Sequence, residues 1–117
     1  MNIEAFRKFC LNKKGVTEDF PFGEDTLCYR VMEKIFAITS FSLPFSVNLK
    51  CDPEKAVEYR ERYDEVKPGY HMNKKHWNTV MFDGTIPDKL LKEMTDDSYN
   101  LIVKGLNKKQ KEELLKL

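Results

Sequence analysis

The chain has 117 residues, of which 41% are hydrophobic and 12% aromatic, a composition typical of a globular protein. This length suits a single domain, residues 1–117, that buries a substantial core. The 20 Lys and Arg residues nearly balance the 19 Asp and Glu residues, and the formal net charge is +1. The large positive excess of a strong non-specific DNA binder is therefore excluded.

Cysteine spacing and charge placement bear on where the protein resides. Cys10, Cys28 and Cys51 lie far apart and form no Cys-x-x-Cys pair, which argues against a disulfide framework and a cysteine-rich zinc site. Free thiols suit the reducing cytosol, so we expect a cytoplasmic protein. The charged N-terminal segment does not resemble a signal peptide, and residues 35–49, nearly uncharged, are too polar to span a membrane.

The first half of the chain predicts one helix followed by strands. In residues 2–13 apolar side chains recur at helical spacing, and Asn2 can cap the helix. Residues 14–26 are expected to form a loop, and Glu33 with Lys34 a tight turn. Strand patterns occupy residues 27–32, 35–41 and 45–51.

The third of these strand patterns, in residues 45–51, alternates most cleanly. Its apolar face, which we expect to be buried, consists of Phe45, Val47, Leu49 and Cys51. The other face is polar. One buried and one solvated face are typical of an antiparallel sheet.

The next elements alternate between helix and strand. Asp52 can cap a helix, and Pro53 suits its first position. The last six residues of the segment 66–82 form a strand pattern, and Asp83 with Gly84 turns the chain.

The last part of the chain predicts helices. Pro87 begins one helix, and Asp96 can cap a separate one that ends near Gly105. Asn107 with Gln110 resembles the capping box of a final helix. The order of elements predicts an α+β fold, in which helices pack on one face of an antiparallel β-sheet.

Residues 66–82 form the most informative segment. They include both histidines and the only tryptophan of the chain, and they contain no Asp or Glu. A segment that combines aromatic, His, Asn and Lys side chains without carboxylates suits contact with an anion. Nucleic acid is the commonest polymeric anion.

Spacing within this segment suggests a hairpin. His71 and His76 are five residues apart and converge only if the chain turns between them. A loop of residues 72–75 would place His71 opposite His76, and Tyr70 opposite Trp77. The tip of this hairpin would carry Asn73, Lys74 and Lys75.

Two functions are compatible with these residues. In a nucleic-acid-binding module, Lys74 and Lys75 would contact phosphates, while Asn73, His71 and His76 would reach base or sugar edges. Residues on or beside neighbouring strands would extend the contact: Lys50, Arg30 and Lys34. So few lysines predict weak, salt-sensitive DNA binding.

The alternative is a module that binds a small ligand or a protein partner. Tyr70 and Trp77, with His71 and His76, would then line a pocket or an interface. A purely structural role in the sheet is open for both aromatic residues. We expect a monomer.

Neither a metal site nor a cofactor nor catalysis is expected. Two histidines without Cys or carboxylate companions do not make a zinc site, which needs three or four converging ligands. Cys51 belongs to the predicted buried face, where a thiol is inert. No set of acid, base and nucleophile can be assembled, so we do not expect an enzyme.

Several runs of residues are shared with a known family. They are Pro-Phe-Gly at 21–23, Lys-Ile-Phe-Ala at 34–37, Asn-Leu-Lys-Cys-Asp-Pro-Glu at 48–54, Pro-Gly-Tyr-His-Met-Asn-Lys-Lys-His-Trp-Asn-Thr-Val at 68–80, and Ser-Tyr at 98–99 followed by Leu-Ile-Val at 101–103. In these runs, which extend over nearly the whole chain, the sequence resembles the MmcQ/YjbR family of small, mostly bacterial proteins.

This resemblance implies an α+β fold similar to that of frataxin (CyaY-like), with helices packed on an antiparallel sheet. It also implies a double-wing motif that is proposed to bind DNA. It does not imply the iron chemistry of frataxin, because that chemistry relies on an acidic helix. The first helix predicted here contributes only Glu4 among its acids.

Overall fold

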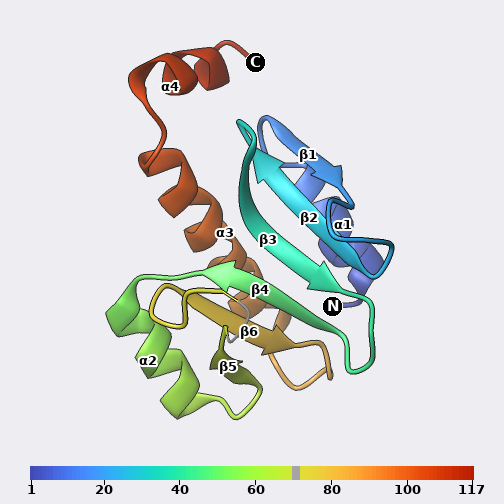
Figure 1. Cartoon of the computed structure of the whole chain (residues 1–117). Coiled ribbons are helices and arrows are strands. Elements are labelled where there is room, and N and C mark those ends of the chain that lie inside the picture. Colours follow the sequence, from blue (N-terminus) through green and yellow to red (C-terminus); the bar gives the residue numbers. More distant parts are fainter. Residues whose placement is uncertain (70–71) are drawn as a thin grey trace.

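The computed structural model describes residues 1–69 and 72–117. The elements of this part of the chain are, in order, α1 (Ile3–Leu11), β1 (Val16–Asp19), β2 (Thr26–Val31), β3 (Lys34–Ser40), β4 (Ser46–Lys50), α2 (Pro53–Arg62), β5 (Val66–Pro68), β6 (Trp77–Met81), α3 (Asp88–Lys104) and α4 (Lys108–Leu115). The strands form one antiparallel sheet in the order β1-β2-β3-β4-β6-β5 (Figure 1). The predicted α+β class is confirmed.

One face of the sheet carries the helices. In Figure 1, α1 and α3 lie behind the sheet, and α2 lies beside its β6–β5 end. A buried row of cross-strand partners faces these helices and consists of Leu27, Thr39, Val47 and Val80. No helix of residues 1–69 and 72–117 covers the face turned toward the viewer. The sheet therefore carries its helices on one face, and β4 buries the side that the alternation in residues 45–51 predicts.

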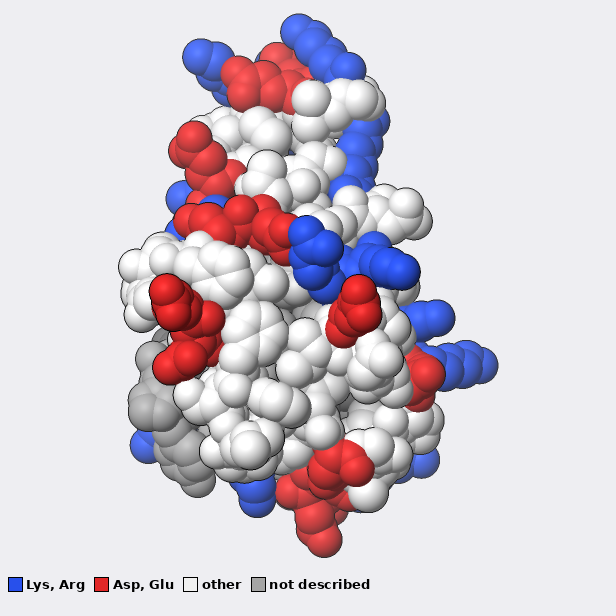
Figure 2. Space-filling view, turned by 90° about the vertical axis from the view of Figure 1, so that its right-hand side faces the viewer, with Lys and Arg blue, Asp and Glu red and all other residues white. Residues whose placement is uncertain are grey.

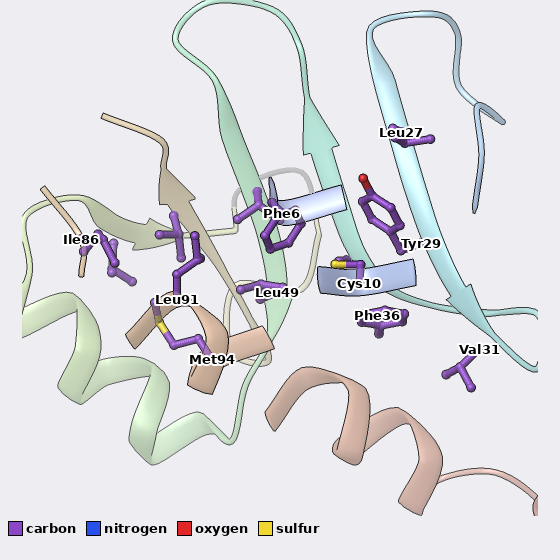
Figure 3. Packing of buried hydrophobic residues seen from close by; sticks show 14 of the residues in the cluster. Phe6, Cys10, Leu27, Tyr29, Val31, Phe36, Leu49, Ile86, Leu91 and Met94 are labelled. Atoms are coloured by element: carbon purple, nitrogen blue, oxygen red, sulfur yellow. The ribbon is translucent and has the colours of Figure 1, made fainter. Parts of the chain in front are cut away.

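Aromatic side chains fill the core between the sheet and the helices. Phe6 of α1, Tyr29 of β2 and Phe36 of β3 are fully buried (Figure 3). The rings of Phe6 and Tyr29 meet edge to face with centroids 5.9 Å apart. Phe36 has no cross-strand partner, because the register of β2 and β3 shifts after Tyr29. This bulge adds Phe36 to the core-facing residues of β3.

Three helix starts were predicted from their capping side chains, and the structure confirms them. The Asn2 side chain accepts a hydrogen bond from the Ala5 backbone N–H at 2.8 Å. Asp52 caps α2 ahead of a proline in its first turn. Asn107 and Gln110 form a reciprocal capping box at α4. These contacts join residues two or three positions apart, which explains why the sequence reveals them.

Residues 14–26, predicted to be a loop, contain strand β1. Val16–Asp19 pairs with β2 from Val31 to Cys28. The sequence of β1, Val-Thr-Glu-Asp, has a single apolar residue and therefore does not show the alternation by which a strand is recognised. β1 forms because the edge of β2 supplies its hydrogen-bond partners. These partners lie elsewhere in the sequence, so the pattern of residues 16–19 does not reveal the strand.

The turn between β2 and β3 lies one residue earlier than predicted. It consists of Met32 and Glu33, whose φ angles are 48° and 69°, and Lys34 already belongs to β3. Two consecutive positive φ angles define a type I′ hairpin turn, whose twist matches that of the strands. Positive φ is uncommon for residues other than Gly, Asn and Asp, so the sequence did not point to these two positions.

α3 is one continuous helix where two were predicted. Asp96, expected to cap a second helix, lies inside Asp88–Lys104. The polar residues Thr95 and Ser98, on either side of Asp96, are both fully buried within the helix. The Thr95 hydroxyl donates to the Leu91 carbonyl oxygen at 2.7 Å, which satisfies it without interrupting the helix.

The Ser98 hydroxyl attaches α3 to two strands. It donates to the Phe36 carbonyl oxygen on β3 at 2.5 Å and accepts from the Lys50 backbone N–H on β4 at 2.9 Å. Ser98 is fully buried, so both backbone groups depend on this side chain rather than on water.

We predict that Ser98→Ala lowers the free energy of unfolding by about 1–3 kcal/mol, because it leaves a buried carbonyl and a buried N–H without partners. Urea denaturation followed by circular dichroism measures this change. Ser42→Ala, at an exposed loop position, is the matched control. A loss no larger than that of the control would contradict the bridging role of Ser98.

Candidate functional site

The uncovered face of the sheet carries two of the predicted contact residues side by side. Lys50 of β4 and Trp77 of β6 are cross-strand partners, so their side chains lie on the same face. Their neighbours Leu49 and Asn78 are 2% exposed and face the helices, which places Lys50 and Trp77 on the opposite, uncovered face. Both side chains are half-buried.

The adjacent row on this face is polar where it crosses β5, β6 and β4. Lys67, Thr79 and Asn48 are successive partners across β5, β6 and β4. The Thr79 hydroxyl donates to Asn48 Oδ1, and Lys67 is exposed. Across β3 and β2 the row continues with Ile38 and Cys28, which are buried. In this row the buried Cys28 and Ile38 separate the polar residues of β4, β6 and β5 from the exposed Asp19 of β1.

A tight turn presents the predicted Asn-Lys-Lys tip next to Trp77. The Asn73 carbonyl oxygen accepts from the backbone N–H groups of His76 at 3.1 Å and Trp77 at 2.9 Å. Asn73 Oδ1 accepts from the Lys75 N–H at 2.9 Å, as in an Asx turn. Asn73, Lys74 and Lys75 are exposed, and His76 is half-buried. The turn therefore directs the two lysines toward solvent.

Arg60 of α2 holds this turn in place. Its NH1 group donates to the Lys74 carbonyl oxygen at 2.9 Å and to Asn78 Oδ1 at 3.3 Å. Asn78 Nδ2 in turn donates to the Ala56 carbonyl oxygen of α2 at 3.2 Å. Sequence reasoning did not select Arg60. The sequence feature that could have identified Arg60 is its position four residues after the buried Ala56, because this spacing places both residues on one face of α2.

The β5–β6 hairpin is present, but its register differs from the prediction by one residue. Pro68 pairs with Asn78, and the Gly69 N–H donates to the Trp77 carbonyl oxygen at 2.9 Å. The prediction had placed Tyr70 rather than Gly69 opposite Trp77. A Cβ atom on Gly69 would lie 2.9 Å from Trp77 Cβ and 3.0 Å from its carbonyl oxygen. Only glycine permits this close approach, which fixes the register.

Two predicted site residues, Tyr70 and His71, lie outside the described residues. The pairing of His71 with His76 and the pocket role of Tyr70 thus stay predictions. The described residues of the predicted site are Arg30, Lys34, Lys50, Asn73, Lys74, Lys75, His76 and Trp77.

Arg30 and Lys34 are not brought to this end of the sheet. Arg30 Nε donates to Asp19 Oδ1 at 2.9 Å, and its NH1 group donates to the Glu33 carbonyl oxygen at 3.1 Å. Lys34 is exposed beside the β2–β3 turn. Three strand spacings separate β2 from β6, roughly 14 Å. The structure thus separates these two residues from Trp77.

Charge is mixed on the side of the molecule where β1 and α1 lie. Figure 2 shows acidic and basic side chains there, separated by a broad uncharged area. This side does not form a continuous basic surface. The lysines of the predicted site lie instead at the β4–β6–β5 end of the sheet, where they favour an anion.

The described residues show little reactive chemistry. Burial, followed by the nearby Asp97 and Asp52 carboxylates, raises the pKa of the Cys51 thiol to about 11, so the thiol is neutral at pH 7. Within residues 1–69 and 72–117, no three His, Cys, Asp or Glu side chains come close enough to hold a metal ion. None of the helices described is both long and apolar enough to cross a membrane.

The fold and this site define an α+β protein with a one-sided antiparallel sheet and a turn anchored to its second helix. A model of the YjbR family matches residues 11–101, and the chain belongs to this family. The resemblance inferred from the sequence is thereby confirmed.

Relatives and solved structures agree with this assignment. The chain is 39% identical to the protein YbdF of Escherichia coli O157:H7 over 91% of this chain and 88% of that protein. It is 30% identical to YjbR of Escherichia coli K12 over the full length of both. The crystal structure of DR2400 of Deinococcus radiodurans, described as a DUF419 domain, superposes with a TM-score of 0.90 at 38% identity, over 97% of this chain and 87% of that one.

We predict that Arg60→Met loosens the turn without unfolding the domain, because the Lys74 carbonyl loses its hydrogen-bond donor from α2. The amides of His76 and Trp77 should then exchange with solvent roughly five times faster, as expected from the loss of a hydrogen bond of about 1 kcal/mol. Hydrogen exchange followed by NMR measures this. Arg62→Met is the control, and equal effects of the two substitutions would refute the anchoring role.

Proposed function

We propose that this protein binds nucleic acid at the β4–β6 end of the uncovered sheet face and at the turn of residues 73–76. The observation that carries the proposal is the cross-strand pair of Lys50 and Trp77 beside the exposed Asn73–Lys75 tip. A half-buried tryptophan keeps part of its ring accessible for stacking on a base. Lysines on either side of it suit phosphate groups on both sides of that base.

The arrangement favours weak binding. Lys50, Lys67, Lys74 and Lys75 are the lysines of this region, and four phosphate contacts at most give modest affinity that falls steeply with salt. Asn73 is the exposed side chain of the tip able to pair with a base edge through both a donor and an acceptor. The site is therefore suited to backbone contact and stacking more than to reading a long sequence.

The double-wing motif implied by the family resemblance would use two hairpins. The β5–β6 hairpin carries the lysine tip, and the β2–β3 hairpin carries Arg30 and Lys34. Because Arg30 is held by Asp19, we assign the principal contact to the β5–β6 hairpin. The alternative pocket for a small ligand or protein partner depends on Tyr70 and His71 together with Trp77, and no observation on the described residues favours it.

We predict that the double substitution Lys74→Glu and Lys75→Glu weakens nucleic-acid binding for all sequences alike and lowers the slope of log affinity against log salt by about two. Fluorescence of Trp77, the only tryptophan, reports binding directly during titration with duplex and single-stranded DNA. Titrations at low and moderate salt give the slope.

Lys108→Glu with Lys109→Glu, the same charge change on α4, is the matched control and should leave affinity nearly unchanged. The proposal would be refuted if DNA quenched Trp77 fluorescence equally at low and moderate salt and equally in the variant with Lys74→Glu and Lys75→Glu. So would the absence of any fluorescence change with both forms of DNA, provided that an independent binding assay also shows no complex.

A further inference from the structure

A cavity of about 220 Å³ lies on the helical side of the sheet, away from Trp77. It is formed where β4 ends, α2 begins and α3 passes by. Its lining includes Cys51, Asp52, Lys55, Asp97, Leu101 and Lys104. The volume is roughly seven times the ~30 Å³ share of one liquid water, which is enough for a ligand of amino-acid size.

The walls of this cavity are held together by hydrogen bonds. Next to Asp97, Ser98 links α3 to the backbone of Lys50, the residue before Cys51. The Cys51 backbone N–H donates to the His76 carbonyl oxygen at 2.8 Å. A cavity with such a frame is preformed, which reduces the ordering cost of binding.

The charges around the cavity are balanced but incompletely paired. The Asp52 carboxylate caps α2 through the N–H groups of Glu54 and Lys55 at 3.2 and 3.4 Å. Asp97 Oδ2 is buried and, within the described residues, accepts no hydrogen bond. The nearest cation, Lys55 Nζ, is 3.8 Å from it, which is beyond hydrogen-bond distance. A buried carboxylate oxygen without a hydrogen-bond partner is stabilised when a cationic group donates to it.

The face of α3 that lines the cavity has three parts in sequence. Asp97, Leu101 and Lys104 are spaced by four and three residues, so they lie in one row along the helix. Lys104 follows Asp97 by seven positions, which corresponds to about 10 Å along the helix axis. A negative end, an apolar middle and a positive end therefore follow one another along the cavity. The neutral thiol of Cys51, 8% exposed, adds to its apolar lining.

We propose that this cavity binds a small linear zwitterion, an ω-amino carboxylate. Its ammonium group faces Asp97, its short alkyl chain lies against Leu101, and its carboxylate faces Lys104. The alkyl chain is required because the two charged ends of the site are too far apart for the adjacent groups of a compact α-amino acid. This proposal is independent of nucleic-acid binding, since none of these three residues belongs to the sheet face.

The test is an NMR titration of the ¹⁵N-labelled whole chain with 5-aminopentanoate. We expect saturable shifts of the Asn100, Leu101 and Lys104 amides. Three control compounds each omit one feature: pentanoate omits the ammonium group, pentylamine omits the carboxylate, and glycine omits the spacing between them. Each should bind at least about tenfold more weakly, the cost of losing one charged hydrogen bond.

Asp97→Asn and Lys104→Gln should each weaken 5-aminopentanoate binding by about tenfold or more. Their spectra also show whether each variant is folded. Asp64→Asn and Lys111→Gln are matched charge controls outside the cavity, and they should bind like the unmodified chain. Lys74→Glu with Lys75→Glu should also bind normally, which separates this site from the proposed nucleic-acid site.

Three results would overturn the proposal. The first is an absence of saturable shifts with 5-aminopentanoate. The second is equal affinity for pentanoate or pentylamine, which would remove the need for both charges. The third is unchanged affinity in folded Asp97→Asn and Lys104→Gln variants, which would place the ligand elsewhere.

Discussion

The hydroxyl of Ser98 is the contact on which the arrangement of helices and sheet depends. It joins the middle of α3 to the backbone of β3 and β4, at the centre of the strand order. A buried hydroxyl with both a donor and an acceptor partner fixes the height of the helix along the strands more narrowly than apolar packing does. The aromatic core of Phe6, Tyr29 and Phe36 then fills the space that this contact defines.

This one-sided packing separates two surfaces with different chemistry. On the uncovered face, Lys50 and Trp77 lie beside a lysine-bearing turn that Arg60 anchors to α2. On the helical side, Cys51, the residue that follows β4, lines a small cavity together with Asp97. The hydrogen bond from the Cys51 backbone N–H to the His76 carbonyl oxygen connects the cavity with the lysine-bearing turn. Lys50, the last residue of β4, and Cys51, the next residue, thus contribute to different candidate sites because successive residues of extended chain point to opposite faces.

Local patterns predicted much of the fold and part of the candidate site. The alternation in β4 and the caps at Asn2, Asp52 and Asn107 depend on neighbours a few residues away, and each was predicted correctly. The acid-free segment likewise pointed to Asn73, Lys74 and Lys75, which are exposed together. Strand β1 and the unbroken α3 were missed, because their partners, the edge of β2 and the backbone of β3 and β4, are distant in sequence.

The sequence by itself determined the class of fold, the helix starts, the buried face of β4 and the family. These follow from periodicity, capping and recognisable runs of residues, all of which are local. Only the tertiary structure decided the hairpin register, since it depends on the contact between Gly69 and Trp77. It also decided that Arg30 pairs with Asp19 and that Arg60 holds the turn. The hydrogen-bond partners of long side chains depend on which groups lie nearby in the folded structure, and spacing along the chain does not predict that distance.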